Sequence, residues 1–545
     1  MANGIFVPPP PKNETVKSYA PGSIERKLQK QALDEICSSQ IDIPVIIGGK
    51  EYRTNQTAEL KSPSNHSRKL GHYHIASPEL VELAIETSLK AREKWAALPW
   101  QERAAIFLKA AEMISSSWRY KLNAATMIGQ GKTVYQAEID AACELTDFLN
   151  FNVKYMHEIY SEQPPISPKG VWNRLEYLPL EGFVVAITPF NFTAIAGNLP
   201  TSPAMLGNVI LWKPASTSIL SSYYFMKLLM DAGLPDGVIN FIPCSGATLS
   251  KVAIEHVSMA GVHFTGSTET FGHIWKTIGE NIRKYWIYPR LVGETGGKDF
   301  LIAHNDCDIQ ALATACVRGA FEYQGQKCSA LSRAYFPKSQ WNEIWTAMLK
   351  MIKEIKMGDV TDFTNFMSAV IDKNSFANIK SYIDFARDAS DAEILCGGNY
   401  DDSKGYYIEP TVILTSNPRF KTMAEEIFGP VLTCYIYDDE KLDETLTLID
   451  KTSPYALTGA IFAKNRNVIN KMARALEHAA GNFYINDKPT GAVVGQQPFG
   501  GSRASGTNDK AGSKINLLRW VTIRTLKETF EPPVDFRYPH MKEEV

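Results

Sequence analysis

Short apolar runs alternate with amphipathic stretches from residue 183 onward, and this alternation constrains the fold most. The sequence predicts strands over 183–187, 209–212, 238–242 and 261–264, with a helix over 217–232 between the second and third. Strand and helix in alternation are typical of a parallel sheet in a doubly wound α/β domain. We therefore expect an α/β protein.

A second α/β series follows from Asp299, and a helical region over 77–150 precedes the first. Helices are predicted near 309–323, 340–356 and 375–389, and strands near 333–336 and 431–437. The glycine-rich segment 293–297 lies between the two series and is the expected hinge. A chain of 545 residues is too long for a single core, so two large domains are expected.

Composition excludes several classes of function. The net charge of −2 leaves no basic surplus for nucleic acid, and apolar runs such as 183–187 are too short to span a membrane. Eight cysteines without paired spacing indicate reduced thiols, and no CxxC or HExxH motif supports a metal site. The proline-rich residues 1–12 are expected to be extended and lack the pattern of a transit peptide.

Three polar residues lie on turns or at the ends of these elements, where a substrate could reach them. Cys328 lies on a predicted turn after a helix, Glu294 is flanked by glycines, and Asn191 follows the strand 183–187. Alone, each is better explained structurally, as a packed thiol, a solvated turn carboxylate and a capping amide. Together they supply a nucleophile, a base and an oxyanion donor.

A dinucleotide site is predicted although the G-x-G-x-x-G fingerprint is missing. The segment Gly129-Gln-Gly131 follows a helical stretch and is interpreted as a helix-ending turn. Lys213 and Ser216 follow one predicted strand and could bond ribose hydroxyls. Gly266 and Ser267 follow another and open a helix, whose amino terminus suits a pyrophosphate.

Seven motifs in their order along the chain resemble the aldehyde dehydrogenase superfamily. They are Pro-Phe-Asn-Phe (189–192), Trp-Lys-Pro (212–214), Phe-Thr-Gly-Ser-Thr-Glu (264–269), Gly-Glu-Thr-Gly-Gly-Lys (293–298), Gly-Gln-Lys-Cys (325–328), Glu-Glu-Ile-Phe-Gly-Pro (425–430) and Pro-Phe-Gly-Gly (498–501). More narrowly, 129–133, 326–330, 484–488 and 490–510 resemble the Δ1-pyrroline-5-carboxylate dehydrogenases. The resemblance extends from about Val45 to Tyr538.

The resemblance implies a role for each site residue. Cys328 would be the nucleophile, Asn191 with the Cys328 amide the oxyanion donor, and Glu294 the carboxylate of the hydrolysis step. The cofactor, NAD⁺ with NADP⁺ left open because Ser216 is uncharged, would contact Ile187, Lys213, Ser216, Gly246, Gly266, Ser267, Glu426 and Phe428. Substrate would contact Ser329, Gly491 and Ala492 through its α-carboxylate, and Phe192 and Phe499 through its aliphatic chain.

Two details of the substrate site stay open at this point. Some relatives have serine where this chain has Ala492, so a hydroxyl contact is lost there. The substrate ammonium needs an acidic partner, for which both Glu138 and Glu144 are candidates.

The implied architecture is an aldehyde dehydrogenase fold with a Rossmann-like NAD(P)-binding domain, an α/β catalytic domain and a β oligomerisation arm. Its expected divisions are an N-terminal extension (1–40), the NAD(P)-binding domain (41–172 and 181–294), the catalytic domain (295–497) and the arm (173–180 and 516–530). The alternating residues 521–525 and the segment 174–180 predict paired arms and a homodimer or higher oligomer.

The implied activity is oxidation of L-glutamate γ-semialdehyde to L-glutamate, the second step of proline catabolism, in the mitochondrial matrix or alternatively the cytoplasm. One rival is a dehydrogenase for another carboxylated aldehyde, such as succinate semialdehyde. The other is a non-catalytic structural protein of the same fold, which the joint presence of Cys328, Glu294 and Asn191 disfavours.

Overall fold

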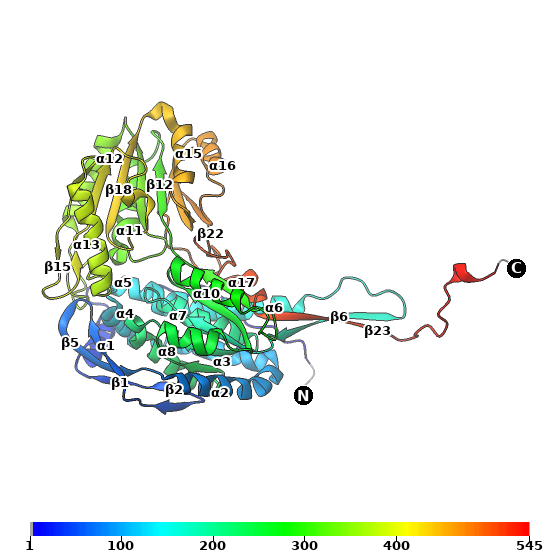
Figure 1. Cartoon of the computed structure of the whole chain (residues 1–545). Coiled ribbons are helices and arrows are strands. Elements are labelled where there is room, and N and C mark those ends of the chain that lie inside the picture. Colours follow the sequence, from blue (N-terminus) through cyan, green and yellow to red (C-terminus); the bar gives the residue numbers. More distant parts are fainter. Residues whose placement is uncertain (1–3, 544–545) are drawn as a thin grey trace.

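A computed structural model describes residues 4–543 as two α/β bodies and a long two-stranded arm (Figure 1). The lower body in Figure 1 contains the first half of the chain, and the upper body contains most of the second. Within residues 4–543, no helix combines the length and apolarity needed to cross a membrane.

The lower body is built on a seven-stranded sheet in the order β11-β10-β7-β8-β9-β2-β3. Its strands are β2 (Val45–Ile47), β3 (Lys50–Tyr52), β7 (Phe183–Ile187), β8 (Val209–Lys213), β9 (Ile239–Phe241), β10 (Met259–Thr265) and β11 (Arg290–Glu294). The five strands from β11 to β9 are parallel, and β2 and β3 add an antiparallel edge. All four predicted strands are confirmed, whereas β2, β3 and β11 were not predicted.

Helices pack around this sheet. They are α2 (Pro78–Ala97), α3 (Trp100–Ser115), α4 (Arg119–Gln130), α6 (Leu145–Ser161), α7 (Thr193–Met205), α8 (Ile219–Ala232) and α10 (Thr268–Glu280), with a π-helical turn over Glu138–Glu144 before α6. Gly131 ends α4 in a left-handed conformation at φ 70°, which confirms that Gly129-Gln-Gly131 is a helix-ending turn.

The upper body contains a second seven-stranded sheet, in the order β14-β17-β18-β13-β12-β20-β21. Its strands are β12 (Asp299–Ala303), β13 (Leu331–Pro337), β14 (Ala392–Cys396), β17 (Thr411–Thr415), β18 (Val431–Tyr437), β20 (Thr458–Phe462) and β21 (Asn482–Ile485). The helices are α11 (Ile309–Phe321), α12 (Trp341–Glu354), α13 (Lys373–Asp388), α15 (Leu442–Thr452) and α16 (Arg466–Ala475). The elements predicted near these positions are confirmed.

Both faces of the upper sheet are buried. On β12, Phe300 and Ile302 belong to one apolar cluster, whereas Leu301 and Ala303 belong to the other. Successive side chains of a strand point to opposite faces, so this alternation places one core on each side of the sheet. The run of apolar residues in β12 therefore belongs to a fully covered parallel strand.

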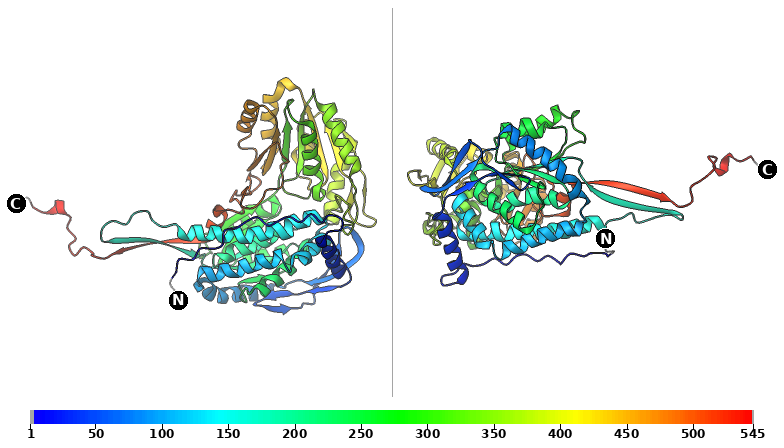
Figure 2. Two further views of the ribbon diagram at one scale, coloured as in Figure 1. Left: turned by 180° about the vertical axis from the view of Figure 1, so that it is seen from behind. Right: turned by 90° about the horizontal axis from the view of Figure 1, so that it is seen from below.

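The arm consists of β6 (Val171–Pro179) and β23 (Val521–Thr529), paired antiparallel along their whole length. It extends away from both bodies (Figures 1 and 2) and confirms the predicted late strand. Residues 514–518 form the short helix α17 against α6, so the strand starts later than residue 516. Apolar side chains such as Trp172 and Ile523 are exposed on the arm.

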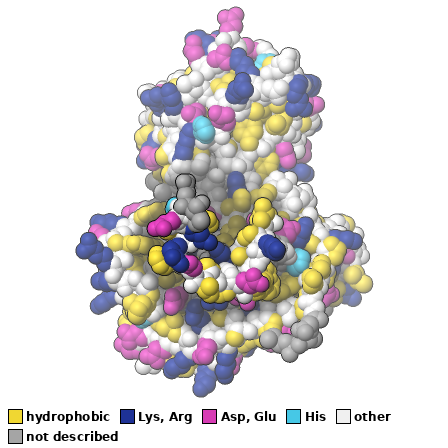
Figure 3. All heavy atoms as spheres, turned by 90° about the vertical axis from the view of Figure 1, so that its right-hand side faces the viewer, with side chains coloured by type: hydrophobic (Ala, Val, Ile, Leu, Met, Phe, Trp, Pro, Cys, Tyr) yellow, Lys and Arg dark blue, Asp and Glu magenta, His cyan; other side chains and the backbone are white. Residues whose placement is uncertain are grey.

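The chain before the first body forms a helix and a small sheet. Residues 4–12 have no regular structure, as the prolines predict, and α1 spans Ile24–Cys37. The small sheet has the order β1-β5-β4, with β1 (Ile41–Ile43), β4 (Thr57–Ser62) and β5 (Asn65–His74). Figure 3 views the molecule from the side of the arm, and hydrophobic side chains are visible there among charged ones.

Candidate functional site

The carboxyl ends of the lower sheet bring several predicted residues to one edge. Ile187 at the end of β7 is in register with Lys213 of β8 and Phe264 of β10, and Thr265 is in register with Glu294 of β11. The Gly266 amide donates to the Glu294 carbonyl at 3.2 Å. Ligands bind at this edge of doubly wound sheets, so the geometry brings the predicted dinucleotide residues and Glu294 together.

The predicted dinucleotide residues offer donors at this edge. Ser267 caps α10, and Gly246 is the first residue of a short helix whose neighbourhood has open space beside its Cα. Burial lowers the pKa of the Lys213 ammonium, and the nearby Cys244 opposes this shift. Ser216 begins the turn before α8. A buried ammonium at the end of β8 and the amino terminus of α10 after β10 are features that fit an anionic ligand such as a dinucleotide.

Glu426 and Phe428 reach the same region from the upper body, on the loop before β18. The Gly297 amide donates to Glu426 Oε1 at 2.8 Å, and a Cβ at Gly296 would lie 2.4 Å from Glu426 Oε2. Burial raises the pKa of Glu426 to about 7, although the Gly297 amide and Lys298 oppose the shift. The Phe428 ring contacts the Phe190 ring edge-on, with centroids 5.8 Å apart. The glycine pair 296–297 therefore permits a contact between the bodies.

Cys328 lies on a strained turn between α11 and β13, as the sequence predicts. Tyr323, Gln324 and Gly325 are consecutive left-handed residues, with φ of 53°, 55° and 66°. The Gln324 side chain holds this conformation by donating to the carbonyls of Gly131 and Ala369 and accepting from the Ser368 amide. Such backbone is costly and persists only where surrounding bonds fix it. The turn thus fixes where the Cys328 thiol lies.

The surroundings of the Cys328 thiol disfavour its thiolate form. Burial raises its pKa well above the usual value, and the nearby carboxyl groups of Asp299 and Glu294 raise it further. We expect a protonated thiol before substrate arrives, because a thiolate lacks a compensating positive charge here.

Asn191 is buried next to the Cys328 turn. Its Nδ2 donates one hydrogen to the carbonyl of Gln326, two residues before Cys328, at 3.1 Å. The Gln326 side chain in turn accepts from the Ile371 amide at 2.8 Å. A carboxamide nitrogen has two hydrogens, so the second remains for another acceptor.

Glu294 has a buried carboxyl group, and one of its oxygens lacks a hydrogen-bond partner among residues 4–543. Its Oε2 has no hydrogen-bond partner within the described part of the chain. Burial raises its pKa well above the usual value, and Lys510 and the Gly501 amide oppose this shift. A Cβ at Gly500 would lie 2.9 Å from its Oε1, so the carboxyl packs against this glycine. Such a group can take a proton once it has been ionised.

One cavity of about 740 Å³ connects Cys328 and Glu294, but not Asn191, with the predicted substrate residues. Its lining includes Cys328, Glu294, Ser329, Gly491, Ala492, Phe192 and Phe499. Ser329 Oγ and Thr490 Oγ1 are 2.7 Å apart, which links the Cys328 turn to the loop 490–497. We call this loop the anchor loop. Arg318 and Lys488 also line the cavity and favour an anionic substrate.

Of the two acidic candidates, Glu144 lines the cavity and Glu138 does not. Glu138 is buried and accepts hydrogen bonds from Arg119, Tyr19 and Asn123. Burial, reinforced by Asp140, raises the pKa of Glu144 to about 8, although Lys132 and Lys327 oppose the shift. Glu138 is thus excluded as a cavity group.

An ion pair that no sequence pattern indicated lies against the Phe192 ring. Lys132 Nζ lies 2.6 Å from Asp140 Oδ2 and 4.0 Å from the centre of the Phe192 ring. The Asp140 carboxylate also accepts from the Thr193 and Ala194 amides at the start of α7. Lys132 lies in the Gly-Gln-Gly-Lys-Thr motif, whereas nothing local marks Asp140.

A group of potential metal ligands lies elsewhere, in the small sheet. The ligand atoms of Asp42, His72 and His74 lie within 4.8 Å of one another. Both histidine Nε2 atoms contact Asp42 Oδ1, and Arg53 pairs with Oδ2 of the same carboxylate. These contacts satisfy the carboxylate without an ion.

Comparison with known proteins agrees with this arrangement of two α/β bodies around a half-buried cysteine. Residues 51–526 match the model of the aldehyde dehydrogenase family. The chain belongs to the aldehyde dehydrogenase family. This confirms the predicted fold.

Three relatives are similar over nearly their full length. A mitochondrial Δ1-pyrroline-5-carboxylate dehydrogenase of Dictyostelium discoideum is 54% identical over 98% of this chain and 96% of its own. The human mitochondrial enzyme of that name is 46% identical over 97% of this chain and 94% of its own. The crystal structure of the Mycobacterium tuberculosis enzyme bound with NAD has a TM-score of 0.96 and 49% identity, covering 99% of this chain and all of that one.

Proposed function

We propose that this protein oxidises L-glutamate γ-semialdehyde, the open form of Δ1-pyrroline-5-carboxylate, to L-glutamate with NAD⁺. The observation that carries the proposal is that Cys328, Glu294, Ser329 and the anchor loop all line one cavity. A thiol, a carboxyl and donors for a carboxylate in one cavity match an aldehyde that bears an α-carboxylate. The names of the relatives support this substrate.

Cys328 is the nucleophile in this proposal. Its thiol gives its proton to water as Sγ bonds to the aldehyde carbon, and the carbonyl oxygen becomes an oxyanion. The free hydrogen of Asn191 Nδ2 and the Cys328 amide stabilise that charge, since Asn191 already bonds the same turn. One such donor is typically worth about 3 kcal/mol in the transition state.

The cofactor would be held at the sheet edge by the residues predicted from the sequence. These are Ile187, Lys213, Ser216, Gly246, Gly266, Ser267, Glu426 and Phe428. NAD⁺, when bound, supplies the hydride acceptor that converts the adduct on Cys328 to a thioester. Ser216 presents no carboxylate against a 2′-phosphate, and the NAD-bound structure of the relative favours NAD⁺.

Glu294 acts in the second half of the reaction. Its carboxylate takes a proton from water as the water oxygen bonds to the thioester carbon. The C–S bond then breaks, Cys328 recovers its proton, and glutamate leaves. The Oε2 of Glu294 supports this role, because it is an acceptor without a partner in the described chain, on a residue that lines the cavity.

The other cavity residues bind the rest of the substrate. The Ser329 hydroxyl and the amides of Gly491 and Ala492 donate hydrogen bonds to the α-carboxylate, with Phe192 and Phe499 on either side of the aliphatic chain. Glu144, which lines the same cavity, pairs with the ammonium group. An acidic partner favours an amino acid over succinate semialdehyde, which has no ammonium.

Initial rates of NADH formation test the proposal. We expect the wild type to favour glutamate semialdehyde over succinate semialdehyde in kcat/KM, and Cys328→Ala to lose turnover while NAD⁺ still binds. A preference for succinate semialdehyde would contradict the substrate. Absence of NADH formation with every aldehyde would support a non-catalytic protein instead.

The assembly and location follow from the arm and the relatives. The arm exposes apolar side chains such as Trp172 and Ile523, and we propose that it pairs with a second copy in a homodimer. Mitochondrial names of the relatives support the mitochondrial matrix as the location. Sedimentation of the intact protein tests the dimer.

A further inference from the structure

The residues before α1 form a strap along the outside of the lower body. Residues 13–19, which we call the strap, run across this body toward α1 (Figure 2). Three of them, Asn13, Glu14 and Val16, line the substrate cavity. A segment outside the two domains therefore forms part of the wall of the candidate active site.

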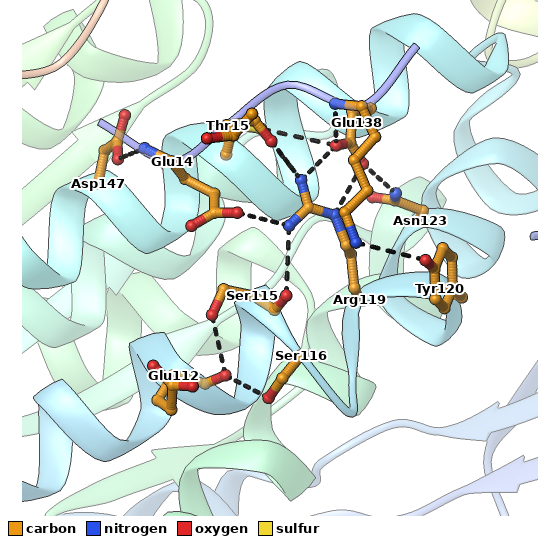
Figure 4. Close-up of polar contacts among 12 residues, drawn as sticks. Glu14, Thr15, Glu112, Ser115, Ser116, Arg119, Tyr120, Asn123, Glu138 and Asp147 are labelled. Atoms are coloured by element: carbon orange, nitrogen blue, oxygen red, sulfur yellow. Dashed lines mark hydrogen bonds and ion pairs between the residues drawn. The ribbon is translucent and has the colours of Figure 1, made fainter. Parts of the chain in front are cut away.

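The strap is hydrogen-bonded to a buried ion pair of the lower body. Arg119 and Glu138 are fully buried and bond each other, and Figure 4 shows Arg119 between Glu138 and Glu14. Arg119 donates to Glu14 Oε1 at 2.7 Å and to the Thr15 carbonyl at 2.8 Å. Glu138 accepts from the Lys17 amide at 2.9 Å and the Tyr19 hydroxyl at 2.6 Å. These charge-assisted bonds hold the strap in one place.

Asn13 joins the strap to two sides of the cavity. Its Nδ2 donates to Asp147 Oδ2 of α6 at 2.8 Å and to the Val494 carbonyl of the anchor loop at 2.7 Å. Its Oδ1 accepts from Gln496 Nε2, also on the anchor loop, at 2.9 Å. The Glu14 amide adds a bond to Asp147 Oδ1 at 2.7 Å. One carboxamide thus uses both its donors and its acceptor to hold the anchor loop against α6.

We propose that Asn13 is a positioning residue that holds the anchor loop in the conformation that binds the substrate carboxylate. The inference rests on the proposed function, because it assigns the α-carboxylate to Gly491 and Ala492. Gly491 adopts φ 97°, and the loop around it contains little regular structure. Outside bonds must therefore define its shape, and Asn13 provides two of them.

Loss of the Asn13 side chain should weaken substrate binding and leave the chemical step unchanged. The substrate carboxylate is remote from the reacting carbon, so the enzyme binds it equally in the ground state and the transition state. Weakening this contact therefore raises KM and leaves kcat unchanged. Asn13→Ala removes three bonds, and we expect the KM for glutamate semialdehyde to rise about tenfold. Asn13→Asp should be worse, because it places a carboxylate against Asp147.

The test compares Asn13→Ala and Asn13→Asp with Thr15→Ala in the full-length protein. Thr15 is an exposed residue of the same strap and contributes its carbonyl to Arg119, so its side chain serves as the matched control. Steady-state kinetics are measured with glutamate semialdehyde and with pentanal, which has no carboxylate. Hydrogen–deuterium exchange of residues 490–497 is measured without substrate.

We expect both Asn13 variants to raise the KM for glutamate semialdehyde and the exchange rate of the anchor loop. The KM for NAD⁺ and the rate with pentanal should match those of Thr15→Ala. Unchanged exchange, or faster exchange with an unchanged KM, would overturn the proposal. If the wild type does not oxidise glutamate semialdehyde, the proposed function fails, and exchange of the loop alone decides whether Asn13 holds it.

Discussion

Gly297 packs directly against the backbone of Cys328, and a Cβ at Gly297 would lie 2.3 Å from the Cys328 carbonyl oxygen. Alanine there must displace the turn that holds the thiol, since backbone cannot move aside as a flexible side chain can. We expect Gly297→Ala to lower kcat/KM at least about a hundredfold, as a displacement of about 1 Å can. Gly272→Ala on α10 is the control, because its Cβ would meet open space. Equal activity of the two variants would contradict this contact.

The raised pKa of Cys328 makes its alkylation dependent on pH. The thiol is neutral below its pKa and the thiolate is the reactive form, so alkylation should be slow at pH 7. We expect the rate with iodoacetamide to rise about tenfold per pH unit toward pH 9. Mass spectrometry of the peptide containing Cys328 gives this rate. Fast alkylation that does not vary between pH 6 and 7 would instead indicate a stable thiolate.

Replacing Glu294 by Gln should separate the two halves of the reaction. The amide cannot take a proton from water, so hydrolysis of the thioester should slow by about 10² or more while the first turnover stays fast. Rapid mixing should then show a burst of NADH followed by a slow steady state. A variant that slows the burst and the steady state equally would remove Glu294 from the hydrolysis step.

The raised pKa of Glu144 predicts that affinity for the amino acid product increases with pH. Its pKa is raised to about 8, so the group is neutral below that pH and gains its charge as the pH rises through 8. The Kd of L-glutamate should therefore fall several-fold between pH 6.5 and 8.5. Glutarate, which lacks the ammonium, should show no such gain, and Glu144→Gln should abolish it for glutamate. A parallel improvement for glutarate would assign the effect to another group.

The strands and helices were predictable because their apolar periodicity is local. Strand 183–187 matches β7 residue for residue, and the turn at Cys328 follows from the helix that ends before it. The contacts that hold this turn were not predictable, since Gln324 bonds Gly131 and Ala369 across the fold. The choice between Glu138 and Glu144 likewise depended on Arg119, whose pairing with Glu138 no local pattern reveals.

The buried pair Lys132 and Asp140 should be essential for stability as well as for the position of Phe192. Lys132 is fully buried, and its ammonium contacts Asp140 and the Phe192 ring. Lys132→Met leaves the Asp140 carboxylate buried without its counter-ion, which typically costs about 3–5 kcal/mol. Lys154→Met is the matched control, because Lys154 is exposed and its pair with Glu158 on α6 contributes about 0.3–0.5 kcal/mol at most. Urea unfolding followed by fluorescence measures both changes. Equal unfolding midpoints for the two variants would mean that Asp140 needs only the Thr193 and Ala194 amides.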